Sequence, residues 1–311
     1  MTPRERVISP FVTLLPAALL AMVLVSAPAH AAGGVGDLFV TSDASNVVRA
    51  YVGNTGALIG THSTAVLGSG ELGIHFGLLN GRYLVGSFGG GVDEYDATSG
   101  AYIKTYSTTG GWQWTGLYGP NGNVYIGSFT TGDVREYDAT TGLLVSILYS
   151  VPDPADMAIG PNGNLYICQF NLGAVSEITF GGTLVNQWFL PAGSQANDIA
   201  FLPGGNIVVT AMRTNVMYRY SPALVLNGIY MGTGWDRPHG VDISPIDGNL
   251  YVADGVTTQV HVFDPVTMVE LNAGFLLPNP GDKIVDLEFR RDNRIVNISP
   301  STWSRIKNLV P

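Results

Sequence analysis

The chain has 311 residues, of which 46% are hydrophobic and only 13% are charged, and its net charge is −9. This composition is far from that of a disordered protein. The acidic balance argues against nucleic-acid binding, because phosphate groups need a basic surface. Forty glycines and an aromatic content of 10% favour short strands joined by tight turns over helices.

The N-terminus has the three parts of a secretory signal peptide. Two arginines precede the apolar run FVTLLPAALLAMVLVSA, and the small-x-small site Ala29-His30-Ala31 follows. We therefore expect residues 1–31 to be cleaved and residues 32–311 to form one exported domain, periplasmic or extracellular, without a membrane span. A retained anchor is the alternative, although the run contains Pro16 and is shorter than the ~20 apolar residues that a span needs. After cleavage, 13 basic and 23 acidic residues remain, and the net charge is −10.

From residue 37 onward the chain repeats a unit of about forty residues. The stretch GPNGNVYIGSF at Gly119–Phe129 returns 41 residues later as GPNGNLYICQF at Gly160–Phe170. In each unit a turn signal such as Asn-Gly precedes a strand-forming segment, and a second glycine turn introduces another strand. A further apolar segment precedes each Asn-Gly, so each unit is predicted to hold four strands. In chain order, the units open their second strands at Asp37, Asn80, Asn121, Asn162, Gly204, Asp247 and Asp292.

A four-stranded meander repeated at this pitch predicts an all-β fold, a β-propeller of antiparallel blades. The first unit begins at its second strand, and the last ends after roughly three strands. Segments from the two ends of the chain are therefore expected to close the ring together. Seven blades are the preferred count, and six blades with a shared closing blade are the alternative. A β-solenoid fits less well, because its repeats are usually shorter and lack four-stranded meanders.

The segment RPHGVDISPIDGNLYVADGVTTQVHVFD at Arg237–Asp264 resembles the NHL repeat. It is also similar to repeats of the SMP-30/gluconolactonase group and of streptogramin (virginiamycin B) lyases. The resemblance extends more weakly over residues 37–299 and implies the propeller fold. It does not decide the function, because propellers of this kind include binders, hydrolases and lyases. The shared elements are Pro238-x-Gly240, Asp247-Gly248-Asn249, Tyr251-Val252-Ala253-Asp254 and Val260-x-Val262-Phe263-Asp264.

The lactonase resemblance also implies where a metal would lie, just before the innermost strand of successive blades. Asn197 fits that pattern, and His239 offers a ligand nitrogen in place of the expected asparagine. Trp114 and Ala155 offer no ligand atom, and the histidine and glutamate of the lyases have no identifiable counterparts. The positions that correspond to the lactonase ligands are Gly73, Trp114, Ala155, Asn197, His239 and Val285.

One position further along, the innermost strands carry three aspartates. Equivalent positions converge on the axis, so these carboxylates should lie close together, and an oxygen-rich ring suits a divalent metal such as Ca²⁺, Mg²⁺ or Zn²⁺. Asp156, Asp198, Asp286 and Asn197 are therefore candidate metal ligands, and His239 is a candidate catalytic base. The alternative is that the aspartates bind neighbouring backbone N–H groups. The residues at this level are Ile74, Thr115, Asp156, Asp198, Gly240 and Asp286.

Aromatic residues precede two of the innermost strands. Trp112 and Trp114 lie in GWQWTG, Trp235 precedes a later strand, and Arg213 is a rare basic residue on the same predicted face. Exposed tryptophans at the channel mouth would stack on a sugar or another flat ligand, whereas packing over the blade ends is the alternative. Blade-end packing is expected for four loop residues that stand in register, Phe88, Phe129, Phe170 and Met212.

The sequence contains no nucleophile elbow, P-loop or zinc-protease motif. We therefore predict a monomeric, non-enzymatic binding or scaffold protein that takes a small molecule, a glycan or a protein at its channel mouth. The alternative is a metal-dependent hydrolase or a streptogramin-lyase-like enzyme with its site at the same mouth. Cys168, the single cysteine, is expected to be a buried core residue rather than a reactive thiol.

Overall fold

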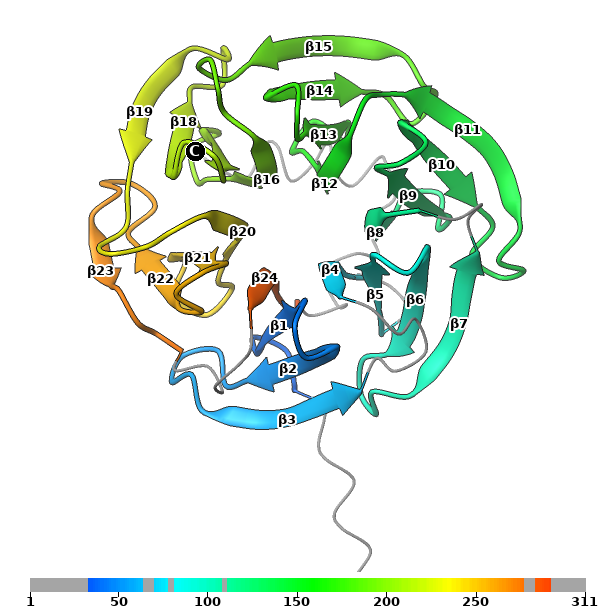
Figure 1. Cartoon of the computed structure of the whole chain (residues 1–311), viewed down its shortest axis with the longest axis horizontal. Helices are drawn as coiled ribbons and strands as arrows, with labels where there is room; N and C mark the ends of the chain where they lie inside the picture. Colours follow the sequence, from blue (N-terminus) through cyan, green and yellow to red (C-terminus); the bar gives the residue numbers. More distant parts are fainter. Residues whose placement is uncertain (1–32, 64–69, 78–80, 108–110, 277–282, 292–311) are drawn as a thin grey trace, which may run out of the picture.

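The computed structural model describes residues 33–63, 70–77, 81–107, 111–276 and 283–291. These residues form 24 strands and no helix (Figure 1). It follows that no described segment is a helix able to cross a membrane. The signal peptide predicted for residues 1–31 and the strand predicted from Asp292 lie outside the described residues.

The strands are arranged as six four-stranded antiparallel blades around a central axis, two of which are joined into one eight-stranded sheet by a single residue pair, Ser87 opposite Gln113. Blade 1 holds β24 (Ile284–Phe289), β1 (Leu38–Ser42), β2 (Val47–Tyr51) and β3 (Leu58–Ser63). Blade 2 holds β4 (Glu71–Phe76), β5 (Arg82–Ser87), β6 (Gly91–Asp96) and β7 (Tyr102–Ser107). Blade 3 holds β8 (Gln113–Tyr118), β9 (Val124–Ser128), β10 (Asp133–Tyr137) and β11 (Leu144–Ser150).

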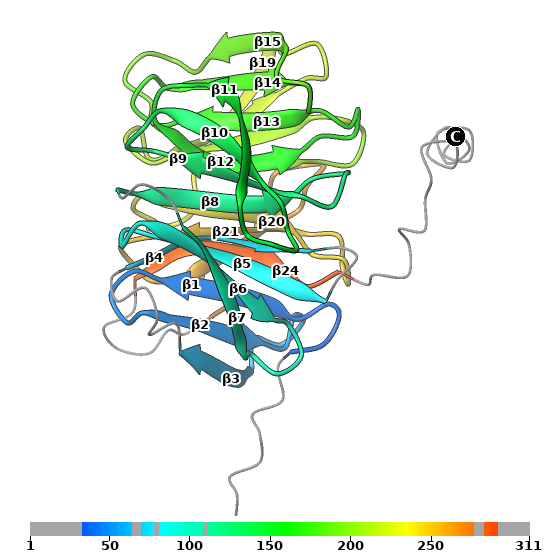
Figure 2. The same ribbon diagram turned by 90° about the vertical axis from the view of Figure 1, so that its right-hand side faces the viewer.

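The second half of the ring repeats this order. Blade 4 holds β12 (Pro154–Ile159), β13 (Leu165–Gln169), β14 (Ala174–Ile178) and β15 (Leu184–Phe189). Blade 5 holds β16 (Ala196–Phe201), β17 (Ile207–Ala211), β18 (Val216–Tyr220) and β19 (Leu226–Tyr230). Blade 6 holds β20 (Pro238–Ile243), β21 (Leu250–Asp254), β22 (Val260–Phe263) and β23 (Glu270–Asn272). In the side view, the innermost strand β8 lies between the outermost strands β15 and β3 (Figure 2).

The two ends of the chain close the ring, as predicted. Strand β24 supplies the innermost strand of blade 1 by pairing antiparallel with β1, with Leu38 opposite Phe289 and Thr41 opposite Asp286. The innermost strands β4, β8, β12, β16, β20 and β24 contact one another in an unbroken cycle. The described residues therefore match the six-blade alternative and not the preferred seven. The physical reason is that β24 completes the first unit, so no strand among them is left over to begin another blade.

The repeated eleven-residue stretch builds the hairpin between the first two strands of a blade. Gly122 and Gly163 have φ values of 83° and 81°, which only glycine adopts without strain. The Asn121 side chain accepts the N–H of Asn123 at 3.1 Å, which completes the turn. Because these contacts lie within a few residues, the turn repeats wherever the sequence repeats.

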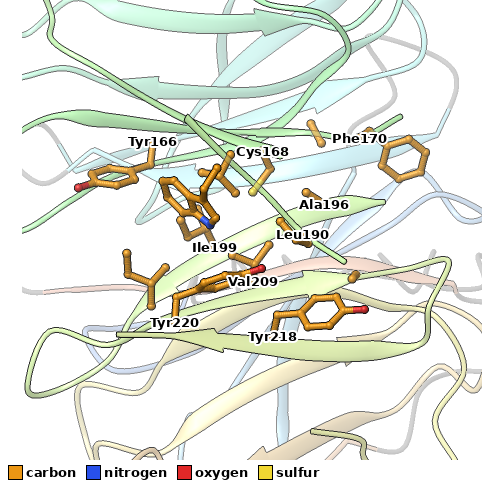
Figure 3. Packing of buried hydrophobic residues seen from close by; sticks show 14 of the residues in the cluster. Tyr166, Cys168, Phe170, Leu190, Ala196, Ile199, Val209, Tyr218 and Tyr220 are labelled. Carbon is orange, nitrogen blue, oxygen red and sulfur yellow. The ribbon is translucent and has the colours of Figure 1, made fainter. Parts of the chain in front are cut away.

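The core lies between adjacent blades. In one cluster, side chains of blade 4 such as Tyr166 and Leu190 pack with Ile199, Val209 and Tyr218 of blade 5 (Figure 3). Cys168 lies in the same cluster and is fully buried, as expected. Burial and the nearby Asp198 and Asp156 raise the pKa of its thiol, so it remains protonated at neutral pH.

Candidate functional site

Three carboxylates meet at the axis of the ring. Asp156 lies on β12, Asp198 on β16 and Asp286 on β24, and one oxygen of each lies within 4.8 Å of the others. All three side chains are 3–5% exposed. The predicted convergence of these aspartates is therefore confirmed, and it brings together blades 4, 5 and 1.

Two of these aspartates also tie neighbouring blades together. Asp198 accepts hydrogen bonds from the N–H groups of Ile199 in its own strand and Val241 in β20, both at 2.5 Å. Asp286 repeats the pattern with the N–H groups of the next residue in β24 and of Ile74 in β4, both at 2.7 Å. The expected alternative, in which aspartates bind backbone N–H groups, is thus present in the same cluster.

The other residues at this level of the ring shape the space around the carboxylates. Gly240 leaves room for Asp286, because a Cβ atom at Gly240 would lie 2.2 Å from an Asp286 carboxylate oxygen. Thr115 is fully buried, and a hydrogen bond from its side chain helps to lower the pKa of Asp156.

His75 joins the aspartates, although the sequence analysis did not select it. Its Nε2 lies 2.9 Å from Asp156 Oδ1, and its Nδ1 lies 3.6 Å from Glu288 Oε2. Burial alone would lower its pKa, but Asp156 and Glu288 raise the pKa of His75 to about 10. The imidazole is therefore a cation at neutral pH. One signal was present in the sequence, because Glu288 lies two residues after Asp286 and so faces the same side of β24.

The carboxyl groups respond differently to burial. Burial and the neighbouring Asp156 raise the pKa values of Asp198 and Asp286 well above the ordinary range. Burial would raise the pKa of Asp156 as well, but the pairing with His75 lowers it. Burial raises the pKa of Glu288 to about 7, against the opposing effect of His75. The pKa values of these four carboxyl groups therefore differ, although the groups lie in one cluster.

A second ion pair extends the charged group along the axis. Arg291 lies 2.5 Å from Asp242 Oδ1 and 3.5 Å from Glu288 Oε1. Asp242 accepts the N–H of Ile243 at 2.8 Å and that of Phe289 in β24 at 2.9 Å, so it also ties two blades. The charged residues beside the axis thus include five carboxylates and two cationic side chains.

Three of the positions that correspond to lactonase ligands carry buried apolar side chains. Trp114, Ala155 and Val285 are buried in one apolar cluster there, so they offer no ligand atoms. Asn197 is buried and His239 is partly buried, and Asn197 Oδ1 and His239 Nδ1 lack hydrogen-bond partners. Burial lowers the pKa of His239 to about 4. Within the described residues, the histidine that bonds to the axial aspartates is His75, not His239.

The tryptophans differ in exposure. Trp112 is 44% exposed, and its ring lies 5.0 Å from that of Phe88 and 5.4 Å from that of Phe129. Trp114 and Trp235 are buried, which matches the alternative of packing and not exposure at the channel mouth. Aromatic rings from neighbouring strands and loops cover both side chains.

The loop residues predicted to pack over the blade ends do so. All four lie in or against the cluster that contains Trp114. Arg213 is exposed in the loop between β17 and β18, at the same end of the blades. The residues confirmed in this packing are Phe88, Phe129, Phe170 and Met212.

The comparisons with known proteins give information on the fold of the chain. No protein-family model and no curated protein sequence matches the chain. It is similar to a chain of a nidogen/laminin complex, at 14% identity and a TM-score of 0.68, over 82% of this chain and 98% of that one. It is similar to virginiamycin B lyase from Staphylococcus aureus, at 13% identity and a TM-score of 0.62, over 79% and 83%. It is also similar to a protein of unknown function from Bacteroides caccae, at 15% identity and a TM-score of 0.63, over 81% and 97%.

These likenesses confirm the predicted β-propeller. The structures that share it include an enzyme and a chain from a protein complex. At such low identity the fold does not carry the function with it, so the function must be argued from the residues of this chain.

Proposed function

We propose that the chain is an exported β-propeller that acts as a binding scaffold, and that its partner contacts the end of the ring that carries Trp112. The main evidence for the proposal is the partly exposed indole of Trp112, whose ring packs against the rings of Phe88 and Phe129. An aromatic side chain that is held in place by packing against other rings is typical of an anchor residue in an interface.

The packing at this end favours a broad partner over a small molecule that enters the channel. Residues from five of the six innermost strands belong to one apolar cluster, so side chains fill the ring near Trp112. A protein surface or a glycan can lie across such an end. The exposed Arg213 adds a positive charge to it. These residues of the cluster are Leu72, Trp114, Ala155, Ala196 and Val285.

The burial of the axial aspartates supports binding over hydrolysis or elimination. A metal-dependent hydrolase or lyase needs substrate beside its metal, whereas these carboxylates are 3–5% exposed. Asp198 and Asp286 already hold N–H groups of two strands each. His239, the predicted base, makes no hydrogen bond to them in the described part of the chain.

Site-specific crosslinking tests the proposal. A photoreactive amino acid replaces Trp112 in one version of the full chain and Phe189, an exposed residue of the outer strand β15, in another. Each is presented to the secreted proteins and surface glycans of the producing cells. We expect an adduct at position 112 that unlabelled chain competes away and that Trp112→Ala chain does not. Equal labelling at both positions, or no specific adduct at 112, would overturn the proposal.

Export is tested separately, by the mass and location of the mature chain. The chain recovered outside the cytoplasm should have the mass of residues 32–311. A chain that stays in the membrane fraction with residues 1–31 attached would instead support the retained anchor.

A further inference from the structure

A groove of about 470 Å³ separates blades 4 and 5, which are neighbours in the ring (Figure 1). Its walls come from the turn between β12 and β13, from the strands of blade 4 beside that turn, and from blade 5. Trp112 directly precedes β8, whereas the equivalent turn of each blade follows the innermost strand. The groove and Trp112 are therefore at opposite ends of the ring. The lining residues include Tyr166, Glu177, Val185, Asn186, Phe201 and Pro222.

Glu177 gives the groove a negative charge. Among the described residues that line the groove, it is the only charged one. The side-chain amides of Asn162, Asn164 and Asn186 donate to its carboxylate at 2.6–2.7 Å. These hydrogen bonds lower its pKa against the effect of burial, so Glu177 is ionised at neutral pH. Neutral amides stabilise the carboxylate, but they do not cancel its charge.

Blade 2 supplies the equivalent carboxylate with cations of its own. Arg82 Nη1 lies 3.0 Å from Glu94 Oε1, and Lys104 Nζ lies 3.8 Å from Glu94 Oε2. In the strand register, Lys104 on β7 is opposite Glu94 on β6. Asn186 on β15 is opposite Glu177 on β14 in the same way. Blade 4 therefore has a shorter and neutral side chain where blade 2 has a lysine.

The lysine of blade 2 also bonds to the next blade. Its Nζ donates to the backbone carbonyls of Ala139 at 2.5 Å and Thr140 at 3.0 Å, just after the end of β10. Pro222 and Ala223 stand at the same places after the end of β18, and no hydrogen bond within the described residues uses either carbonyl. The groove between blades 4 and 5 thus repeats the acceptors of Lys104 without the lysine.

We propose that this groove binds a small primary alkylamine as its ammonium ion. The ammonium takes the place that Lys104 Nζ has in blade 2, beside Glu177 and the carbonyls of Pro222 and Ala223. Three donors on one ammonium match these three acceptor groups. The inference is independent of the binding function proposed above, because it concerns the other end of the ring.

The walls of the groove select an amine with a hydrocarbon chain. Val185, Phe201 and Leu224 line the groove together with the ring of Tyr166, so an alkyl chain loses its contact with water there. An ammonium close to an aromatic face gains a further attraction. The net charge of −9 also raises the local concentration of cations around the chain.

The size of the groove favours a free amine over a lysine of a partner protein. Its volume of about 470 Å³ is within the usual range for small-molecule sites. Glu177 is only 3% exposed, so a ligand must enter the groove to reach it. A slender alkylamine can do so without a protein backbone behind it.

The first experiment is an NMR titration of the isotope-labelled full chain with pentylamine at pH 7.5. The side-chain amide signals of Asn162, Asn164 and Asn186 report binding beside Glu177. We expect saturable shifts, and binding of 1-pentanol at least about tenfold weaker, because a hydrogen bond to a charged group is stronger than one between neutral groups. Equal affinity for the alcohol, or no saturable shift with pentylamine, would overturn the proposal. Tighter binding of a lysine-containing peptide would overturn the choice of a free amine.

Three substitutions locate the amine. Glu177→Gln removes the charge and should weaken pentylamine binding at least about tenfold. Asn186→Lys introduces the lysine of blade 2 at the equivalent place and should abolish binding in a folded chain. Glu136→Gln is the matched control, because Glu136 also accepts asparagine amides. In that blade the ring of Tyr125 packs 4.9 Å from the ring of Phe180, which follows β14 as Pro222 follows β18, so affinity should not change.

The control separates a ligand carboxylate from a structural one. Equal loss of pentylamine binding in Glu136→Gln and Glu177→Gln would overturn the assigned site. If Glu177→Gln does not fold, Asn186→Lys decides, and normal pentylamine binding by that variant would overturn the proposal. Trp112→Ala should bind pentylamine normally, so failure of the partner-binding proposal and failure of the amine site are distinguishable.

Discussion

Carboxylates occur in two contrasting settings in this ring. In blades 3 and 4 a glutamate lies beside the repeated Asn-Gly-Asn turn of its own blade. Glu177 accepts hydrogen bonds from the side-chain amides of Asn162 at 2.7 Å, Asn164 at 2.6 Å and Asn186 at 2.7 Å. At the axis, by contrast, three blades contribute one carboxylate each, and these face one another.

The local setting lowers the pKa of its carboxyl group, whereas the axial setting raises the pKa values of Asp198 and Asp286 and lowers only that of Asp156, which pairs with His75. Burial would raise the pKa of Glu177, but the asparagine amides lower it. Burial and Asp156 raise the pKa of Asp286. A repeat unit can stabilise its own carboxylate with amides encoded a few residues away. A charge cluster assembled from several units needs a partner from another strand, such as His75.

The largest expected effect comes from crowding the axis. Gly240→Ala would place a Cβ atom 2.2 Å from an Asp286 oxygen and 2.8 Å from the Leu287 nitrogen. Overpacking alone costs about 1–3 kcal/mol, and displacing Asp286 also leaves buried N–H groups unpaired. We expect a loss of about 4 kcal/mol in the free energy of unfolding, measured by urea denaturation.

A glycine in the repeated turn is the control for Gly240. Gly163 has a φ of 81°, but no atom lies within 4 Å of where its Cβ would be. Gly163→Ala should therefore cost only the backbone strain, about 1 kcal/mol. Similar losses for the two alanines would show that the axis is less tightly packed than the contacts indicate.

An intermediate effect is expected at the amide-bonded glutamates. Glu177→Ala removes the acceptor of three amide hydrogen bonds from a buried site and should lower the free energy of unfolding by about 2 kcal/mol. Glu136 has the same role in blade 3, where Asn121 and Asn123 donate to it, but it is only half-buried. Glu136→Ala should therefore lower the free energy of unfolding by a smaller amount. The reverse order would exclude burial as the source of the difference.

The fold was predictable because its turns are local. The Asn-Gly-Asn turn and the aspartate turn, in which Asp138 accepts the N–H groups of Thr140 and Thr141 at 3.0 Å and 2.7 Å, repeat with the sequence. The number of blades could not be predicted from local sequence. It depends on β24 pairing with β1, which joins segments almost 250 residues apart.

The candidate site was predictable only in part, for related reasons. The three aspartates share one repeat position, so the repeat alone brings them together. His75 was missed because its partners lie on other strands, Asp156 on β12 and Glu288 on β24. The burial of Trp114 depends on Phe129 and Phe170, which lie on loops of two different blades.

The smallest expected effect concerns a histidine that stabilises carboxylates within one blade. His261 is buried in blade 6, with Nδ1 at 2.7 Å from Glu270 Oε1 and Nε2 at 3.7 Å from Asp254 Oδ2. Burial alone would lower its pKa, but these two carboxylates raise it above 6.5. The charged imidazole should therefore stabilise the folded chain fully below pH 6.5, and this contribution should vanish as the pH rises through the higher folded-state pKa.

His261→Gln tests this pH dependence, because glutamine can still donate a hydrogen bond but carries no charge. Urea denaturation of both chains at pH 6 and again at pH 9 gives the difference in the free energy of unfolding. We expect the variant to be less stable by about 1 kcal/mol at pH 6 and the difference to shrink at pH 9. A difference that is equal at both pH values would mean that His261 contributes through packing against Trp235 and not through its charge. The contrast between locally stabilised and axial carboxylates would then rest on the asparagine amides alone.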